Sequence, residues 1–281
     1  MANTVNKNII VPEVYASLVR EKIKGKCKVA QFLVNLGDLH GKIGETIQFP
    51  KYSYIGDGKD WDINTPMDVT QMKQTTTTAT IKAIQAPAVK VADYDDEVEL
   101  GNAIEEASNQ QAIAVGRKYD TDAIACALTS PLKFQLATKN TVTQAEMISI
   151  LGLYGDDRDS ADFDAIVIHS SFAPSFYAMD MFTSRERTMT KDGNGIAVNG
   201  VIGEFLGIPV VLSDRLYDAT NQEGFILVMK KNAISIIPKE NPFAEVSRDA
   251  SLRQSIIYLS QFYAMALTDD TAIVFAKTVL S

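Results

Sequence analysis

Apolar residues near the start of the chain recur with the period of a helix. Pro12 suits the first turn of a helix, because a proline there loses no hydrogen bond. From Glu13 to about Lys24, four apolar side chains follow at three- and four-residue spacing: Tyr15, Leu18, Val19 and Ile23. Gly25 is typical of a helix end. The pattern predicts an amphipathic helix, and two roles remain open for it: a solvated surface helix, or an arm that lies on a neighbouring subunit.

The pattern then changes to a two-residue alternation in two runs, 44–54 and 69–82. Ile47 and Phe49 alternate with polar residues in the first run, and four consecutive threonines, Thr75 to Thr78, favour a strand in the second. The stretch between the runs is rich in Gly, Asp, Asn and Pro, which are typical of turns. We therefore predict a two-stranded hairpin that projects from the body, with its tip near residues 56–64. Such a ribbon is marginal alone, so it needs a partner surface.

The middle of the chain predicts one long helix followed by a mixed α/β region. The run from Asn102 to about Leu128 holds no proline, one glycine and apolar residues at helical spacing. Thr143 and Glu146 then have the spacing of a capping box. Short strand-like and helical runs alternate from there to about residue 237.

The tract from Phe243 to Leu267 alternates irregularly between apolar and polar residues. Ile257 and Leu259 share one phase, and Tyr258 and Phe262 share the other. This irregularity predicts a strand with a bulge or bend that lies along the long helix. We expect Tyr258 and Phe262 to be buried there.

Composition and charge describe a folded, acidic chain. Of its 281 residues, 46% are hydrophobic and the formal net charge is −8. An acidic chain is a poor match for tight DNA wrapping, which needs clustered Lys and Arg. Cys27 and Cys126 are far apart in sequence and are expected to be reduced, buried thiols. The chain shows no run of about 18–20 apolar residues, so no membrane span is expected.

The first forty residues depart from the acidic balance. Their basic side chains Lys22, Lys24, Lys26 and Lys28 outnumber the acidic ones nearby. We expect this group to contact an acidic surface of a neighbour, with 93–99 as the candidate. We also expect that a subunit without residues 1–28 folds but assembles poorly.

No motif in the sequence indicates catalysis or a cofactor. His169 precedes Ser170 and Ser171, but no G-x-S-x-G elbow accompanies them, and a strand-end histidine that caps a helix is the favoured interpretation. Neither His40 nor the cysteines have zinc spacing. The aspartates of 155–164 are interpreted as a solvated loop rather than a cation site. The sequence therefore predicts no catalytic, cofactor-binding or metal-binding residue.

Five segments, in this order, resemble the major capsid proteins of tailed bacteriophages with the Hong Kong 97-type fold. They are Pro12 to Tyr15, Gly44 to Tyr52, Asp120 with Ala123 and Ala127, Phe163 to His169, and Gly203 to Val211 with Ser213. The resemblance spans nearly the whole chain. It implies an α+β capsid fold with an N-terminal arm, an extended β-hairpin loop, a long spine helix, a peripheral domain and an axial domain.

The resemblance also divides the chain into domains. The expected division is an arm over 1–40, the extended loop over 41–85, a peripheral domain over 86–131 and 240–270 with the spine helix at 102–128, and an axial domain over 132–239 and 271–281. Beside the arm lysines, the expected inter-subunit contacts are three residues of the hairpin: Asp57, Asp60 and Trp61.

The implied function is that of a shell subunit without enzymatic activity. Such subunits form hexamers and pentamers, close an icosahedral head and enclose double-stranded DNA by weak, non-specific contact. A separate scaffolding protein and a portal are the expected partners, and the expected location is the virion capsid, assembled in the cytoplasm of the bacterial host. Two alternatives stay open: an encapsulin-like nanocompartment shell and an α/β enzyme with an unrecognised site.

Overall fold

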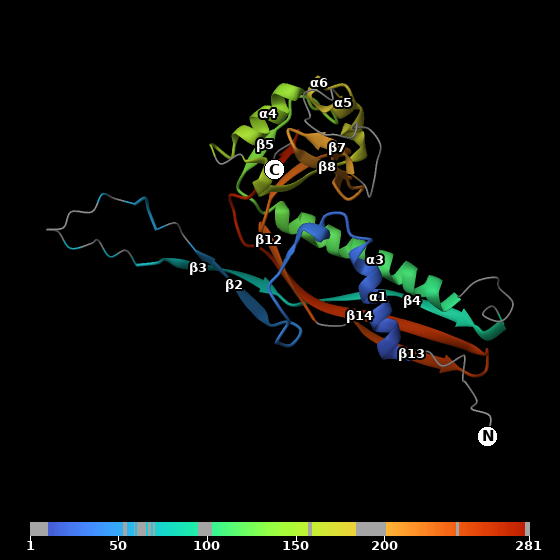
Figure 1. Cartoon of the computed structure of the whole chain (residues 1–281). Coiled ribbons are helices and arrows are strands. Elements are labelled where there is room, and N and C mark those ends of the chain that lie inside the picture. The colour runs from blue at the N-terminus through green and yellow to red at the C-terminus, as the bar shows by residue number, and fades with distance from the viewer. Residues whose placement is uncertain are drawn as a thin grey trace.

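The computed structural model describes residues 11–52, 55–58, 60, 66, 69, 71–94, 103–156, 159–183, 201–239 and 242–278. A long helix, α3 (Ala103–Ala127), crosses the molecule between two sheets, and a hairpin extends to one side (Figure 1). No helix in these ranges is long and apolar enough to cross a membrane. The predicted long helix is confirmed to within one residue at each end.

A six-stranded sheet forms the upper body of Figure 1. Its strands, in spatial order, are β5 (Lys133–Gln135), β15 (Ile273–Lys277), β11 (Ile226–Lys230), β6 (Phe163–Ile168), β8 (Ile208–Leu212) and β7 (Val201–Phe205). The helical turns of this region are α4 (Gln144–Gly152), α5 (Ala173–Tyr177), α6 (Asp180–Thr183), η2 (Ser160–Asp162) and η3 (Ser170–Phe172). The small hairpin β9 (Tyr217–Asp218) and β10 (Glu223–Gly224) joins them. The central strands β6 and β11 are almost entirely buried, as their continuous apolar sequences require.

A five-stranded sheet lies on the other side of α3. Its path is β1 (Val34–Asn35), β12 (Ile234–Pro238), β14 (Gln254–Leu267) and β13 (Phe243–Asp249), and β4 (Lys82–Ala92) pairs with β14 as well. The arm helix α1 (Pro12–Lys24) lies across α3, and the 3-10 turn η1 (Ala30–Phe32) follows it (Figure 1). The helix predicted for the arm is therefore confirmed.

Strand β14 confirms the predicted irregularity but not the predicted buried side. Its pairing with β4 shifts register between Ile257 and Leu259, which is a bulge. Ile257, Leu259 and Tyr263 are buried, whereas Tyr258 is 38% exposed and Phe262 is only partly buried. The expectation that Tyr258 is buried is wrong, because α3 covers the other face of the strand. Alternation alone cannot tell which face a helix covers.

The predicted hairpin is confirmed. Strands β2 (Thr46–Tyr52) and β3 (Gln74–Thr80) pair antiparallel from Thr46↔Thr80 to Tyr52↔Gln74, and they extend away from both sheets (Figure 1). Much of the predicted tip, including Trp61, lies outside the described residues.

Two strands differ from the domain division expected from the sequence. Strand β12 lies inside the predicted axial segment 132–239, yet it pairs with β14 of the five-stranded sheet. Strand β1 belongs to the predicted arm, yet it pairs with β12 in the same sheet. A short apolar run does not reveal which sheet it will join, because that depends on partners distant in sequence. The remaining domain boundaries stay a prediction.

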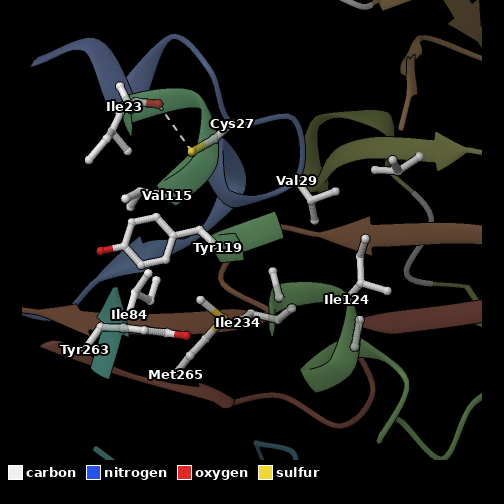
Figure 2. Packing of buried hydrophobic residues seen from close by; sticks show 14 of the residues in the cluster. Ile23, Cys27, Val29, Ile84, Val115, Tyr119, Ile124, Ile234, Tyr263 and Met265 are labelled. Carbon is white, nitrogen blue, oxygen red and sulfur yellow. Dashed lines mark hydrogen bonds between the residues drawn. The ribbon is translucent and has the colours of Figure 1, made fainter. Parts of the chain in front are cut away.

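One apolar core joins the two sheets through α3. It holds residues from α1, α3, both sheets and the segment between α1 and β1, including Cys27 and Val29 (Figure 2). A second cluster fills the other face of the six-stranded sheet. Both cysteines are free, and burial raises the pKa of the Cys27 thiol to about 12, with a further rise from the nearby Asp120. Cys27 is buried as predicted, whereas Cys126 is only partly buried.

The predicted capping box at α4 is present and carries a testable pH dependence. The Thr143 hydroxyl accepts the Glu146 N–H at 3.3 Å, and the Glu146 carboxylate accepts N–H groups of Thr143 at 2.8 Å and Ala137 at 3.0 Å. Burial opposes ionisation, but these hydrogen bonds outweigh it and lower the pKa of Glu146 below its usual 4.5.

We expect Glu146→Ala to lower the free energy of unfolding by about 1 kcal/mol. A depressed pKa contributes stability above the unfolded-state value and loses it as pH falls through the folded-state value. The difference between wild type and variant is therefore complete above about pH 4.5 and closes below it. Denaturant unfolding at several pH values measures this, and a difference that stays constant down to pH 3 would contradict it.

Candidate assembly surfaces

Three of the arm lysines, Lys22, Lys26 and Lys28, lie on the body of their own subunit. Lys22 Nζ lies 2.9 Å from Ser108 Oγ, 3.2 Å from the carbonyl oxygen of Glu105 and 3.8 Å from the Glu105 carboxylate. Lys26 and Lys28 line a cleft of about 340 Å³ between α3 and the end of β8. The side chain of Lys24 lies outside the described part. Lys22 thus has an acidic partner within the chain.

The predicted contact residues do not form one group. Asp57 and Asp60 are exposed on the hairpin, away from the arm, and Trp61 is not described. Of the acidic candidate 93–99, the structure describes Asp93, which forms a bidentate pair with Arg248 of its own chain at 2.5 Å. This hydrogen bond lowers the pKa of the Asp93 carboxyl. A role for these residues in contacts between subunits stays a prediction.

A buried carboxylate on α3 anchors the arm. Asp120 is 3% exposed and accepts the backbone N–H groups of Lys28, Val29 and Ala30 at 2.9, 2.9 and 2.8 Å. Burial raises the pKa of Asp120, and the three N–H donors oppose this rise. From the sequence, only the resemblance to capsid proteins indicated Asp120. No residue near it along the chain indicates that its hydrogen-bond partners lie about ninety residues earlier.

The arm helix is divided between a buried face and an exposed face. Tyr15, Val19 and Ile23 are buried in the main core, which contradicts the expectation that a subunit without residues 1–28 would fold normally. That deletion removes core side chains as well as the arm. The opposite face leaves three apolar side chains exposed: Val11 at 45%, Val14 at 63% and Leu18 at 36%.

The base of the hairpin is anchored to the body. Phe49 is fully buried in a small cluster with Ala79 and Ile81 of the hairpin and with Ala264 and Ala266 of β14. Lys51 Nζ forms an ion pair with Asp270 at 2.7 Å. The sequence indicated Phe49 as an inward position of the alternation, but not the strand that it contacts.

Apolar side chains beyond the hairpin base are exposed. Ile55, Val69 and Met72 are 62%, 96% and 56% exposed, although each is a large hydrophobic residue. Leu36 and Ile43, just before the hairpin, are 51% and 62% exposed. Clustered exposed apolar residues mark surfaces for contact with another protein. The hairpin, the segment before it and the outer face of α1 are therefore the candidate assembly surfaces.

Among the described residues, the one Ser/His pair that the sequence indicated has a structural role. His169 Nδ1 lies 2.9 Å from Ser171 Oγ and accepts the Ser171 N–H at 3.2 Å, so the imidazole caps η3. Ser171 in turn donates to the amide oxygen of Asn140. Burial lowers the pKa of His169. Within the described ranges, no group of three or more His, Cys, Asp or Glu side chains could hold a metal ion.

The known proteins that this chain resembles in sequence and in structure are capsid proteins. No protein-family model matches the chain. The chain is 26% identical over 272 residues to the major capsid protein of Staphylococcus phage phiMR11, and the match covers 95% of this chain and 93% of the relative.

Solved capsid structures share the fold. The capsid of the cyanophage P-SCSP1u superimposes with a TM-score of 0.64 at 14% identity, over 91% of this chain and 89% of that one. A virus-like particle from Pyrococcus furiosus gives 0.60 at 10% identity, over 94% and 98%. The Hong Kong 97-type capsid fold expected from the resemblance is thereby confirmed.

Proposed function

We infer that this chain, a phage major capsid protein by its relatives and its fold, assembles into hexamers and pentamers that close an icosahedral head around double-stranded DNA. One observation carries this inference. The hairpin β2–β3 is fixed to the body only at its base, and its exposed Ile55, Val69 and Met72 find no cover in the described part of their own subunit. In a closed shell every subunit has neighbours, and these neighbours would cover the exposed apolar side chains of its hairpin.

The charge of the chain supports a container that holds DNA without binding it tightly. The 27 basic side chains are outnumbered by 35 acidic ones, and this net charge of −8 opposes tight binding to phosphates, so contacts with packaged DNA are weak and non-specific. A separate scaffolding protein and a portal, and assembly in the cytoplasm of the bacterial host, belong to the same proposal. The subunit itself performs no catalysis in it.

Electron microscopy of the purified full-length chain tests the proposal. We expect closed shells of uniform diameter with fivefold and sixfold clusters of subunits, formed either alone or with the scaffolding protein encoded by the same phage. Replacing Val69 by aspartate removes an exposed apolar contact from the hairpin and should abolish shells without changing the thermal unfolding of the subunit. Monomers that never form shells under either condition would refute the shell function.

The nanocompartment remains the second candidate, because the virus-like particle from Pyrococcus furiosus has the same fold. The content of particles from the natural host separates the two. DNA of uniform length inside the particles supports a phage head, and an enclosed protein supports a nanocompartment.

A further inference from the structure

The five-stranded sheet contains a bulge between β14 and β4 that leaves backbone groups without a partner in the neighbouring strand. The register between β14 and β4 shifts between Ile257 and Leu259, so Tyr258 lies opposite both Pro87 and Ala88. A bulge of this kind interrupts the ladder of hydrogen bonds and increases the local bend and twist. Pro87 cannot restore the ladder, because proline has no backbone N–H.

Gln111 of α3 provides the missing donor. Its side chain is buried, with 1% of the residue exposed, and its Nε2 donates to the carbonyl oxygens of Pro87 at 3.0 Å and Ile257 at 3.2 Å. One amide group therefore holds a carbonyl from each strand at the bulge. An amide left without its hydrogen bonds in this position would cost free energy, so these contacts are not incidental.

The arm helix binds the other end of this amide. The Tyr15 hydroxyl donates to Gln111 Oε1 at 2.8 Å, and Tyr15 is itself 4% exposed. Carbonyl oxygens only accept hydrogen bonds, so Nε2 must face the sheet and Oε1 must face Tyr15. The other hydrogen bonds of the arm, from Lys22 to Ser108 and from the N–H of Lys28 to Asp120, reach α3 but not the sheet. Tyr15 thus connects the arm to the sheet through the helix.

We propose that Tyr15 and Gln111 form a latch through which docking of the arm helix holds the bend of the five-stranded sheet. With α1 docked, Gln111 is oriented toward the bulge and the bend is maintained. When α1 leaves α3, Oε1 loses its donor and the amide turns away from the two carbonyls, which frees the sheet to straighten. The consequence for a shell rests on the proposed function: subunits at positions of different curvature would differ in arm docking.

Hydrogen exchange of the full-length subunit tests the latch directly. Tyr15→Phe keeps the ring and removes only the hydroxyl. We expect the backbone amides of Ala86, Ala88, Val89 and 257–259 to exchange about tenfold faster, because the buried amide of Gln111 loses a partner. Tyr119→Phe is the matched control, since the Tyr119 hydroxyl is buried in the same core and makes no hydrogen bond in the described part of the chain. This control should leave exchange at the bulge unchanged.

A double-mutant cycle separates a latch from simple packing of Tyr15. Gln111→Met keeps the length of the side chain and removes the amide. If the hydroxyl acts through Gln111, Tyr15→Phe has no further effect on exchange at the bulge in the Gln111→Met background. Equal effects in both backgrounds, or no effect of Tyr15→Phe at the bulge, would overturn the latch.

The same variants test the step from sheet to shell. Shells of Tyr15→Phe subunits should show a wider range of diameters in electron micrographs than those of wild type or Tyr119→Phe. Faster exchange with an unchanged range of diameters would overturn the link to curvature. Failure of the wild type to form shells would count against the proposed function and leave the exchange result standing.

Discussion

Replacing Tyr263 by alanine is expected to lower the free energy of unfolding by about 5 kcal/mol, the upper end for loss of a large aromatic side chain from a core. Tyr263 is 1% exposed, and its ring packs edge-on against Tyr119 at 5.0 Å (Figure 2). Its hydroxyl donates to the carboxylate of Asp122, which also pairs with Lys118 at 3.0 Å and Lys82 at 3.7 Å. The substitution therefore removes core volume and one partner of a buried carboxylate together.

Tyr258→Ala is the matched control, five residues away on the same strand. Tyr258 is 38% exposed and faces away from α3, so its loss should cost less than about 1 kcal/mol. Tyr263→Phe should lie between the two, because it keeps the ring and loses only the hydroxyl. Urea unfolding of the three variants gives the order. A larger effect for Tyr258→Ala than for Tyr263→Ala would mean that α3 covers the other face of β14.

Replacing Phe49 by alanine is expected to detach the hairpin from the body and to prevent shell assembly. Phe49 is fully buried, and loss of a buried phenylalanine costs about 3–5 kcal/mol. Most of this cost falls on the hairpin base, because Phe49 is fully buried in the cluster that joins the hairpin to Ala264 and Ala266 of β14. The ion pair between Lys51 and Asp270 is half exposed on the aspartate side and cannot replace the lost contact.

Limited proteolysis measures whether the hairpin is detached in Phe49→Ala, and an assembly assay measures its yield of shells. The hairpin of Phe49→Ala should be cleaved quickly while both sheets stay protected, and the purified variant should yield no shells. Phe243→Ala, at a residue 56% exposed, is the control for the stability of the subunit and should leave cleavage of the hairpin unchanged. A Phe49→Ala subunit that resists proteolysis and assembles normally would show that the base of the hairpin is not its anchor.

Elements with a strong local signal could be predicted from the sequence. The helix over 103–127, the hairpin over 46–80 and the capping box at Thr143 were predicted close to their observed bounds. Each depends on residues that are close in sequence: helical periodicity, β-branched residues around a turn, and a threonine three residues before a glutamate. The order of these elements carried the resemblance to capsid proteins, and with it the expected fold and function.

Contacts between distant segments were decided by the tertiary structure alone. The sequence placed β12 with its neighbours along the chain, whereas it pairs with β14 in the other sheet. It did not indicate that Lys22 binds Ser108 and the carbonyl of Glu105 within its own chain. A contact of Lys22 with a neighbouring subunit stays a prediction.

The missed polar contacts share the same origin. Asp120 and Gln111 are ordinary helix residues by sequence, and each gains its role from backbone groups more than twenty residues away. Period and propensity therefore determined which segments form helices and strands, and hence the fold class. The covered face of β14, the anchoring of the arm and the support of the bulge depend on which surfaces pack together, a long-range property that no local pattern contains.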